Sequence, residues 1–290
     1  MKSFLHFITF ILIFSLLTSI LQAQSINGDS TSQVNTNHVK KVYNTIRLST
    51  KKPLIDGILD DDCWKTGNWA GDFIQFVPSE GGIPTYPTEI KVLYDDKFIY
   101  AAFRAYDNEP DKIQRFAGLR DDLTGDMVGI NFDSYHDHRT GFEFNLTAYG
   151  QKIDLVLSNP MSWDVTWNPV WNGKVAMEDS AWTAELEIPL SQLRYSKEDE
   201  QVWGMHAWRW IGRLAEESDW EYQTLTGPGM LYNFGELRGI KGLKKSQRLE
   251  IMPYVLGDLK TFEKQIENPF AREGRSWNGN AGLDVKVGLS

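Results

Sequence analysis

Three tryptophans spaced four residues apart, Trp163, Trp167 and Trp171, are the side chains of this sequence best suited to hold a ligand. Pro160 and Pro169 flank or interrupt the run, so it forms a loop rather than a helix. Sugars carry C–H faces that pack on flat aromatic rings, and such surfaces are usually rimmed by polar groups. The spacing predicts an aromatic platform, or a cap over one end of the fold. Polar neighbours available for the rim are Asn168, Asn172, Asp164 and Gln151.

Carboxylates gather in a second place, where Asp121, Asp122 and Asp126 precede a strand. Calcium takes several oxygen ligands from carboxylates and carbonyls of an irregular loop, which makes this a candidate structural calcium site. The spacing does not match an EF-hand loop, and a solvated acidic turn is the alternative. Weaker candidates for the same chemistry are Asp133, Asp137 and Glu143.

Paired carboxylates that could hydrolyse a glycosidic bond occur once, at Glu185 and Glu187. Their spacing of two places them on one face of a strand, within the separation that glycoside hydrolysis needs. They alternate with Ala184 and Leu186, which is the pattern of the outward face of an amphipathic strand. No nucleophile elbow, zinc-protease or phosphate-loop motif is present. We predict no catalysis by this segment and leave open a glycosidase activity in a longer protein.

Histidine offers little further chemistry. His136 and His138 lie in a polar loop and could hold zinc or copper weakly, or be simple surface residues. Met205 and His206 are adjacent on a strand and point to opposite faces, so they cannot ligate one haem iron together. Near the start of the chain, Trp64 is expected in the core, whereas Trp69 is more open and is a candidate ring for a ligand.

The elements that position these residues are strands. Runs of alternating apolar and polar residues recur, while the 3.6-residue period of helices is nearly absent. The clearest hairpin surrounds the short turn 95–97. We predict an all-β, antiparallel, jelly-roll-like β-sandwich. The strand candidates are 45–48, 52–55, 89–94, 98–105, 127–133, 142–146, 153–157, 182–188 and 202–211.

The two ends of the chain differ from its middle. Residues 1–24 combine Lys2 with an apolar run and predict a signal peptide, and the polar stretch 25–46 predicts a disordered leader. Residues 241–290 predict the start of a further β-rich region that is cut short, with a barrel as one alternative. The net charge of −9 argues against nucleic acid and anionic membranes, and the single Cys63 excludes an internal disulfide.

The segment Pro-Leu-Ile-Asp-Gly-Ile-Leu-Asp from Pro53, followed by Trp64, resembles the opening of family 9 carbohydrate-binding modules. The hairpin 90–107, the strand 126–133 and the strand that ends in Ile188-Pro189 fit the same pattern, so that the resemblance covers about 47–240. It implies a jelly-roll-like sandwich that holds sugar between aromatic rings, with calcium in some members. The later segments 234–240 and 249–254 resemble a narrower group in which such a module precedes a region thought to form an outer-membrane β-barrel.

From residues and resemblance together we expect an exported, non-catalytic carbohydrate-binding domain linked to polysaccharide breakdown or uptake. Its partner would be a glycan, and calcium would be its one structural cofactor. Its location would be the periplasm, outer membrane or cell surface. The alternatives are an accessory domain of an outer-membrane barrel with no sugar ligand, and the targeting module of a glycoside hydrolase.

Overall fold

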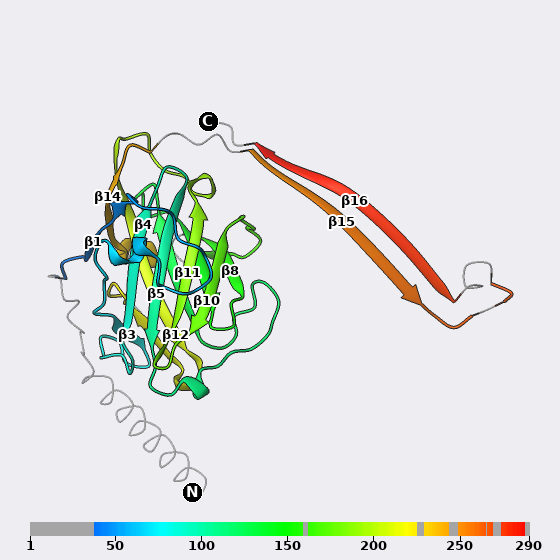
Figure 1. Ribbon diagram of the computed structural model, residues 1–290, viewed down its shortest axis with the longest axis horizontal. Coiled ribbons are helices and arrows are strands. Elements are labelled where there is room, and N and C mark those ends of the chain that lie inside the picture. Colours follow the sequence, from blue (N-terminus) through cyan, green and yellow to red (C-terminus); the bar gives the residue numbers. More distant parts are fainter. Residues whose placement is uncertain are drawn as a thin grey trace, which may run out of the picture. The chain divides into compact units, whose positions relative to one another are not determined.

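The computed structural model describes residues 38–158, 162–224, 229–243, 249–264, 266–268 and 274–287. The predicted signal peptide and most of the leader lie outside these ranges. No helix among the described residues is long and apolar enough to cross a membrane. Two sheets form a β-sandwich, and a separate two-stranded sheet follows it in the chain (Figure 1).

The larger sheet has nine strands, which lie in the order β1-β14-β12-β6-β7-β8-β9, with β13 and β3 continuing from β12. All of its pairings are antiparallel except that of β1 with β14. The bounds of its strands are β1 Val42–Asn44, β3 Ile74–Val77, β6 Met127–Asp133, β7 Thr140–Thr147, β8 Lys152–Ser158, β9 Ser162–Asp164, β12 Glu200–Ile211, β13 Glu216–Asp219 and β14 Gly235–Lys241.

The smaller sheet has five strands in the order β10-β11-β5-β4-β2. Their bounds are β2 Ile46–Arg47, β4 Thr88–Tyr94, β5 Phe98–Tyr106, β10 Asn172–Met177 and β11 Ala181–Pro189. Helical structure in the described part of the chain is limited to short 3-10 turns. These are η1 Asp62–Lys65, η2 Pro110–Lys112, η3 Leu190–Gln192, η4 Gly212–Leu214 and η5 Met230–Asn233.

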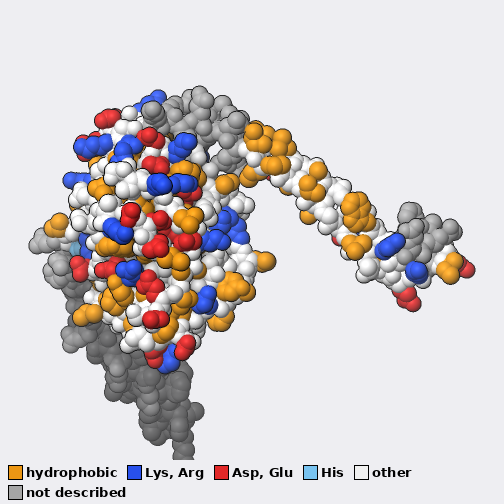
Figure 2. Space-filling model, in the orientation of Figure 1, with side chains coloured by type: hydrophobic (Ala, Val, Ile, Leu, Met, Phe, Trp, Pro, Cys, Tyr) orange, Lys and Arg blue, Asp and Glu red, His pale blue; other side chains and the backbone are white. Residues whose placement is uncertain are grey.

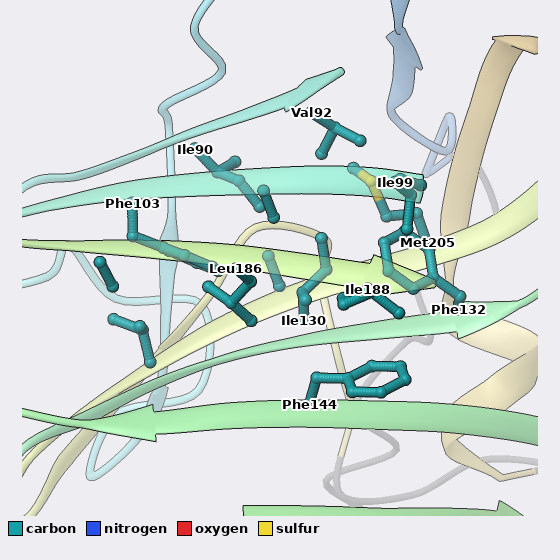
Figure 3. Close-up of a cluster of buried hydrophobic side chains, with 14 of the residues drawn as sticks. Ile90, Val92, Ile99, Phe103, Ile130, Phe132, Phe144, Leu186, Ile188 and Met205 are labelled. Carbon is teal, nitrogen blue, oxygen red and sulfur yellow. The ribbon is translucent and has the colours of Figure 1, made fainter. Parts of the chain in front are cut away.

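The core lies between the two sheets, because each strand turns every second side chain inward. Figure 3 shows Ile90, Phe103 and Leu186 of the smaller sheet meeting Ile130 and Phe144 of the larger one, all of them fully buried. The all-β sandwich that the alternation predicted is therefore confirmed. The strand predicted at 127–133 has the bounds of β6, whereas 52–55 is not a strand.

The segment after β2 packs on the outer side of the smaller sheet, where Trp64 is buried with Tyr100 and Ala102. Glu185 of β11 is fully buried and accepts three hydrogen bonds from this segment: from the backbone N–H of Gly57 at 2.8 Å, that of Asp56 at 3.0 Å, and Trp64 Nε1 at 2.7 Å. Gly57 has φ +93°, and a Cβ there would lie 2.4 Å from the backbone of β10, so the position requires glycine.

Lys91 of β4 holds the same segment from the other side. It shares a row of the sheet with Glu185, since both pair with Ala102 of β5. Its buried ammonium donates to the carbonyls of Trp64 at 2.7 Å and Thr66 at 2.8 Å. Burial lowers the pKa of Lys91. The opening motif is therefore fixed by two buried charged groups that its own backbone satisfies.

The strands β15 (Leu249–Thr261) and β16 (Arg275–Val287) form a hairpin of two 13-residue strands that pair along their whole length. Its register places Ile251, Val255 and Leu259 on one face with Val285 and Trp277 of the other strand. The β-rich character predicted for this region is thus observed for its described residues. Hydrophobic side chains lie along the surface of the hairpin in Figure 2.

Candidate ligand-binding site

The larger sheet carries a polar surface on the side away from the core. In β6, β7 and β12 the core side chains Val128, Ile130, Phe142, Phe144, Met205 and Ala207 take alternate positions, so the positions between them face outward. The strand register then aligns Asn131 with His206 and Glu143, and Gly129 with Trp208 and Asn145. Strand β13 extends the same rows beside β12. We call the resulting set the outer polar face: Gly129, Asn131, Glu143, Asn145, His206, Trp208, Trp210, Glu217 and Asp219.

Glu143 is the centre of this face. Asn131 Nδ2 donates to one carboxylate oxygen at 2.6 Å and Asn145 Nδ2 to the other at 2.7 Å, while the Trp208 side chain is a further hydrogen-bond partner. Burial raises the pKa of Glu143 against the effect of these partners. All of the groups that hold this carboxylate are side chains, in contrast to Glu185.

His206 lies next to this group and is fully buried. Its Nε2 lies 3.2 Å from Asp219 Oδ1, and its Nδ1 lies 3.5 Å from the amide nitrogen of Gln223. Because an amide nitrogen only donates, the ring is oriented with Nδ1 as acceptor and Nε2–H as donor to Asp219. Phe234 stacks on the imidazole of His206 with 5.4 Å between the two ring centres and fixes the plane of the imidazole.

Trp208, Trp210 and Glu217 are half-buried and form the accessible margin of the outer polar face. The Trp208 indole lies over Gly129, where a Cβ would be 2.4 Å from its Nε1. Trp210 and Glu217 are paired across β12 and β13. Burial, and then the neighbouring charge of Asp219, raise the pKa of Glu217 to about 7.

Three buried oxygen atoms of this face have no hydrogen-bond partner among the residues that the structure describes. They are Asn131 Oδ1, Asn145 Oδ1 and Asp219 Oδ2, on side chains that are 0%, 0% and 2% exposed. A buried acceptor without a donor costs about 1–3 kcal/mol, so each such atom needs an explanation. The face combines half-buried indoles with acceptors that lack donors, which is an arrangement suited to a ligand rich in hydroxyl or amine groups.

Comparison with solved structures agrees with this architecture. A family 9 carbohydrate-binding module from Caldicellulosiruptor kristjanssonii, solved with glucose, superimposes with a TM-score of 0.50 at 17% identity, over 70% of this chain and 98% of that one. The fold is that of these modules. A protein from Bacteroides uniformis, proposed to bind carbohydrate, gives a TM-score of 0.55 at 9% identity, over 69% and 99% of the two chains. No family model and no curated protein matches the sequence.

The loop tryptophans are placed differently from the predicted platform. Trp171 is 4% exposed, and its ring centre lies 5.5 Å from that of Phe144. Its Nε1 donates a hydrogen bond to Asp154 Oδ1 at 2.8 Å. Trp167 is half-buried against Phe142 and Phe144. Trp171 thus has almost no free ring face to stack on a sugar, because Phe144 packs on it and the Lys152 ammonium lies 5.4 Å from its ring centre, and Trp163 is the exposed member at 60%.

The other predicted ligand residues do not gather around these rings in one cluster. Trp69 lies over the smaller sheet, with the Lys91 ammonium 4.9 Å and the Arg104 guanidinium 5.8 Å from its ring centre. Asn168 and Asn172 are exposed. Gln151 is buried, and its Oε1 accepts a hydrogen bond from Thr147 at 3.2 Å, while its Nε2 has no partner.

The three carboxylates of the predicted calcium site have separate partners. Asp121 accepts from the backbone N–H of Asp154 at 3.2 Å, and Asp122 from that of Leu119 at 2.8 Å. Asp126 is fully buried and accepts from the N–H of Gly212 at 2.9 Å. Within the described ranges, no group of three or more His, Cys, Asp or Glu side chains is placed to hold a metal. The calcium site stays a prediction to which this geometry adds no support.

The remaining candidates have structural surroundings. Glu185 lies on the outer side of its strand, as the alternation predicts, but the opening segment covers it, and Glu187 pairs with Lys52 at 2.9 Å. His138 stacks on Tyr232 with 5.2 Å between ring centres, and His136 packs edge-on against His138 with 5.1 Å between ring centres. Met205 lies in the core and His206 outside it, as their adjacency on a strand predicts.

The sequence contained a signal for the outer polar face that we did not use. Asn131, Glu143, Asn145 and His206 each occupy the polar position of an alternating strand, where exposed residues are expected. Trp208 and Trp210 occupy alternate positions of one strand and so share its face, and the structure shows both of them half-buried. The alternation along a strand shows which face of the sheet each residue occupies. Which of these side chains lie side by side depends on which strands pair and in what register.

Proposed function

We propose that the sandwich is a non-catalytic carbohydrate-binding domain whose ligand lies on the outer polar face, against Trp208 and Trp210. The observation that carries this proposal is the set of three buried acceptors that find no donor in the described ranges, beside half-buried indoles. Sugar hydroxyls donate to such oxygens, and the C–H faces of the ring pack on indole. Amides and carboxylates beside an aromatic ring supply both kinds of contact.

The comparisons support the class of ligand but not its identity. The module from Caldicellulosiruptor kristjanssonii was solved with glucose and shares the fold of this chain. Its sequence is too distant to carry residue roles across. The proposal for this chain therefore depends on its own side chains, and the sugar is to be found by experiment.

The experiment is a glycan-array screen of the purified chain, with and without calcium, followed by calorimetry on the best ligand. Trp208→Ala and Trp210→Ala should each weaken binding at least about tenfold, since an aromatic contact and its buried area are lost. The matched control is Trp277→Ala, which removes an exposed indole from β16, outside the sandwich, and should leave sugar binding unchanged.

The same titration decides between the outer polar face and the site predicted from the loop. If Trp167→Ala or Trp69→Ala abolishes binding while Trp208→Ala does not, the ligand lies with Trp69, Trp167, Asn168, Asn172 and Gln151, and the outer polar face is not the site. Urea unfolding of each variant separates lost binding from lost folding.

We propose further that the domain is exported and serves polysaccharide breakdown or uptake. The apolar run 4–21 behind Lys2 supports export. The test is expression of the full chain in a Gram-negative host, with cell fractionation and N-terminal sequencing. A cytoplasmic protein that keeps Met1 at its terminus would contradict export.

A second candidate function, attachment to a membrane, is favoured by the hairpin. Each strand has 13 residues, about 44 Å when extended, and a tilt of about 45° would give a span of about 31 Å, close to the thickness of a bilayer core. One face carries Ile251, Val255, Leu259, Leu283 and Trp277, all of them exposed. We propose that this face lies against lipid.

Flotation of the purified chain with phosphatidylcholine vesicles tests the lipid proposal. Val255→Lys should abolish association, because a charge on the apolar face opposes insertion. Asn278→Lys is the matched control on the polar face and should float normally. Equal flotation of both variants, or no flotation of the unaltered chain, would exclude contact with lipid through this face.

A further inference from the structure

The outer polar face is acidic as well as rich in acceptors. Glu143, Glu217 and Asp219 contribute three carboxyl groups to it. Among the described residues that face outward on β6, β7, β12 and β13, none is a lysine or arginine. The charged groups that shift the pKa of Glu217 are Asp219, Glu143 and His206.

The histidine is directed at one of these carboxyl groups. With Nδ1 accepting from Gln223, its Nε2–H points at Asp219 Oδ1. This hydrogen bond involves only one of the two oxygens of Asp219. Asp219 Oδ2 is one of the buried oxygens without a donor.

The three buried oxygens without a donor all require the same kind of ligand group, a hydrogen-bond donor. Asn131 Oδ1, Asn145 Oδ1 and Asp219 Oδ2 are acceptors, so a ligand has to bring donors. An ammonium group brings three donors and a positive charge. Trp208 and Trp210 add half-buried indole rings at the margin, and indole is the aromatic side chain that attracts cations most strongly.

We propose that this face selects sugars that carry a free amine, such as glucosamine oligomers, over neutral sugars, and that it rejects uronic acids. The inference rests on the proposed carbohydrate function of the same site. An amine would lie between the indoles and the carboxylates of Glu217 and Asp219, where it meets opposite charge on one side and aromatic rings on the other. A uronic carboxylate would face carboxylates of its own sign.

Calorimetry at neutral pH and low salt tests this with four probes of equal length: oligomers of glucosamine, N-acetylglucosamine, glucose and galacturonic acid. The glucosamine oligomer should bind about tenfold more tightly than its acetylated form, since acetylation removes the charge. The difference should shrink in 0.5 M salt, and the galacturonic acid oligomer should not bind.

Glu217→Gln tests whether the negative charge that attracts the amine lies on this face. The variant removes the carboxyl group and keeps the shape of this half-buried side chain. It should lower the affinity for the glucosamine oligomer several-fold more than the affinity for the glucose oligomer. Glu198→Gln, an exposed carboxyl group in another loop, is the matched control and should change neither.

The outcomes separate the two proposals. Equal or tighter binding of the neutral oligomers, dependent on Trp208, would overturn the amine preference and keep the carbohydrate function. Amine preference unaffected by Glu217→Gln and Trp208→Ala would place the cation elsewhere and overturn the assignment to this face. Folded protein that binds none of the oligomers would overturn both.

Discussion

The two outer surfaces of the sandwich each bury a glutamate beside a tryptophan, yet the two glutamates have different surroundings. Glu185 accepts from two backbone N–H groups and from Trp64, all in the segment that covers its sheet. Glu143 accepts from side chains of its own sheet. Around Glu185 the chain itself supplies the donors, whereas around Glu143 three neighbouring oxygens have no donor within the described part of the chain.

The difference shows why a shifted pKa does not by itself mark a functional group. Burial raises the pKa of both glutamates, which is also what structural networks do. What separates the two surfaces is hydrogen-bond satisfaction. A buried polar group that the chain satisfies stabilises the fold, and one that it leaves unmatched needs a ligand or water.

The largest expected effect is a loss of stability at Glu185, the glutamate whose hydrogen bonds are all supplied by the chain. Glu185→Ala removes the acceptor of three donors, two of them buried, and should lower the free energy of unfolding by about 3–5 kcal/mol. Urea unfolding followed by tryptophan fluorescence measures it. Glu187→Ala, two residues along the same strand and paired with Lys52 near the surface, is the control and should cost less than about 1 kcal/mol. Equal losses would mean that the opening segment is not held by Glu185.

The pH dependence of stability gives the next largest effect. Burial raises the pKa of Glu185 from 4.5 to about 7. A carboxyl group whose pKa is higher in the folded state favours folding when protonated, so its contribution is complete below pH 4.5 and is lost as the pH rises through about 7. The loss should reach about 3 kcal/mol at most. Unfolding free energies between pH 4 and 8 should show this slope, and Glu185→Gln should remove much of it.

Glu217 allows the same comparison on the other surface, since its pKa is also raised to about 7. Its titration should change ligand binding as well as stability, whereas that of Glu185 should change stability alone. Calorimetric titrations of Glu185→Gln and Glu217→Gln across this pH range separate the two. A pH-dependent affinity that survives Glu217→Gln would show that another group controls binding.

The fold could be predicted from the sequence because burial of alternate residues repeats in every strand. The hairpin of β4 and β5 around 95–97, and β6 itself, follow from period two and turn chemistry alone. The opening segment 52–55 was misassigned as a strand. Its backbone donors bind a glutamate about 130 residues away, and local propensity contains no information about such a partner.

The candidate site was harder to predict for the same reason. Trp163, Trp167 and Trp171 attracted attention through their spacing, but spacing does not show that Phe144 lies against Trp171. Asn131 and Glu143 meet because β6 pairs with β7 in one register, and a slip of one residue would separate them. Sites built across strands are determined by pairing, which one sequence does not reveal.

A smaller effect is expected from the glycine that makes room for Trp208. In Gly129→Ala the new methyl group would lie 2.4 Å from the indole Nε1 and 2.1 Å from Asn145 Oδ1. The ring must move, so ligand affinity should fall several-fold while the free energy of unfolding drops by about 1–3 kcal/mol. Gly71→Ala, whose nearest contact would be 3.8 Å away, is the control. Unchanged affinity in Gly129→Ala would mean that the position of Trp208 does not matter to the ligand.

The smallest effect concerns the acidic loop, whose described carboxylates resemble Glu185 in having partners within the chain. Asp122 accepts from the backbone N–H of Leu119, and asparagine can accept the same bond. Asp122→Asn should therefore change the free energy of unfolding by less than about 0.5 kcal/mol. Thermal unfolding with 1 mM calcium or with EDTA is the measurement. A calcium-dependent rise in Tm that Asp122→Asn removes would make this loop a metal site. The loop would then resemble the surroundings of Glu143, where acceptors are left for a ligand, rather than those of Glu185.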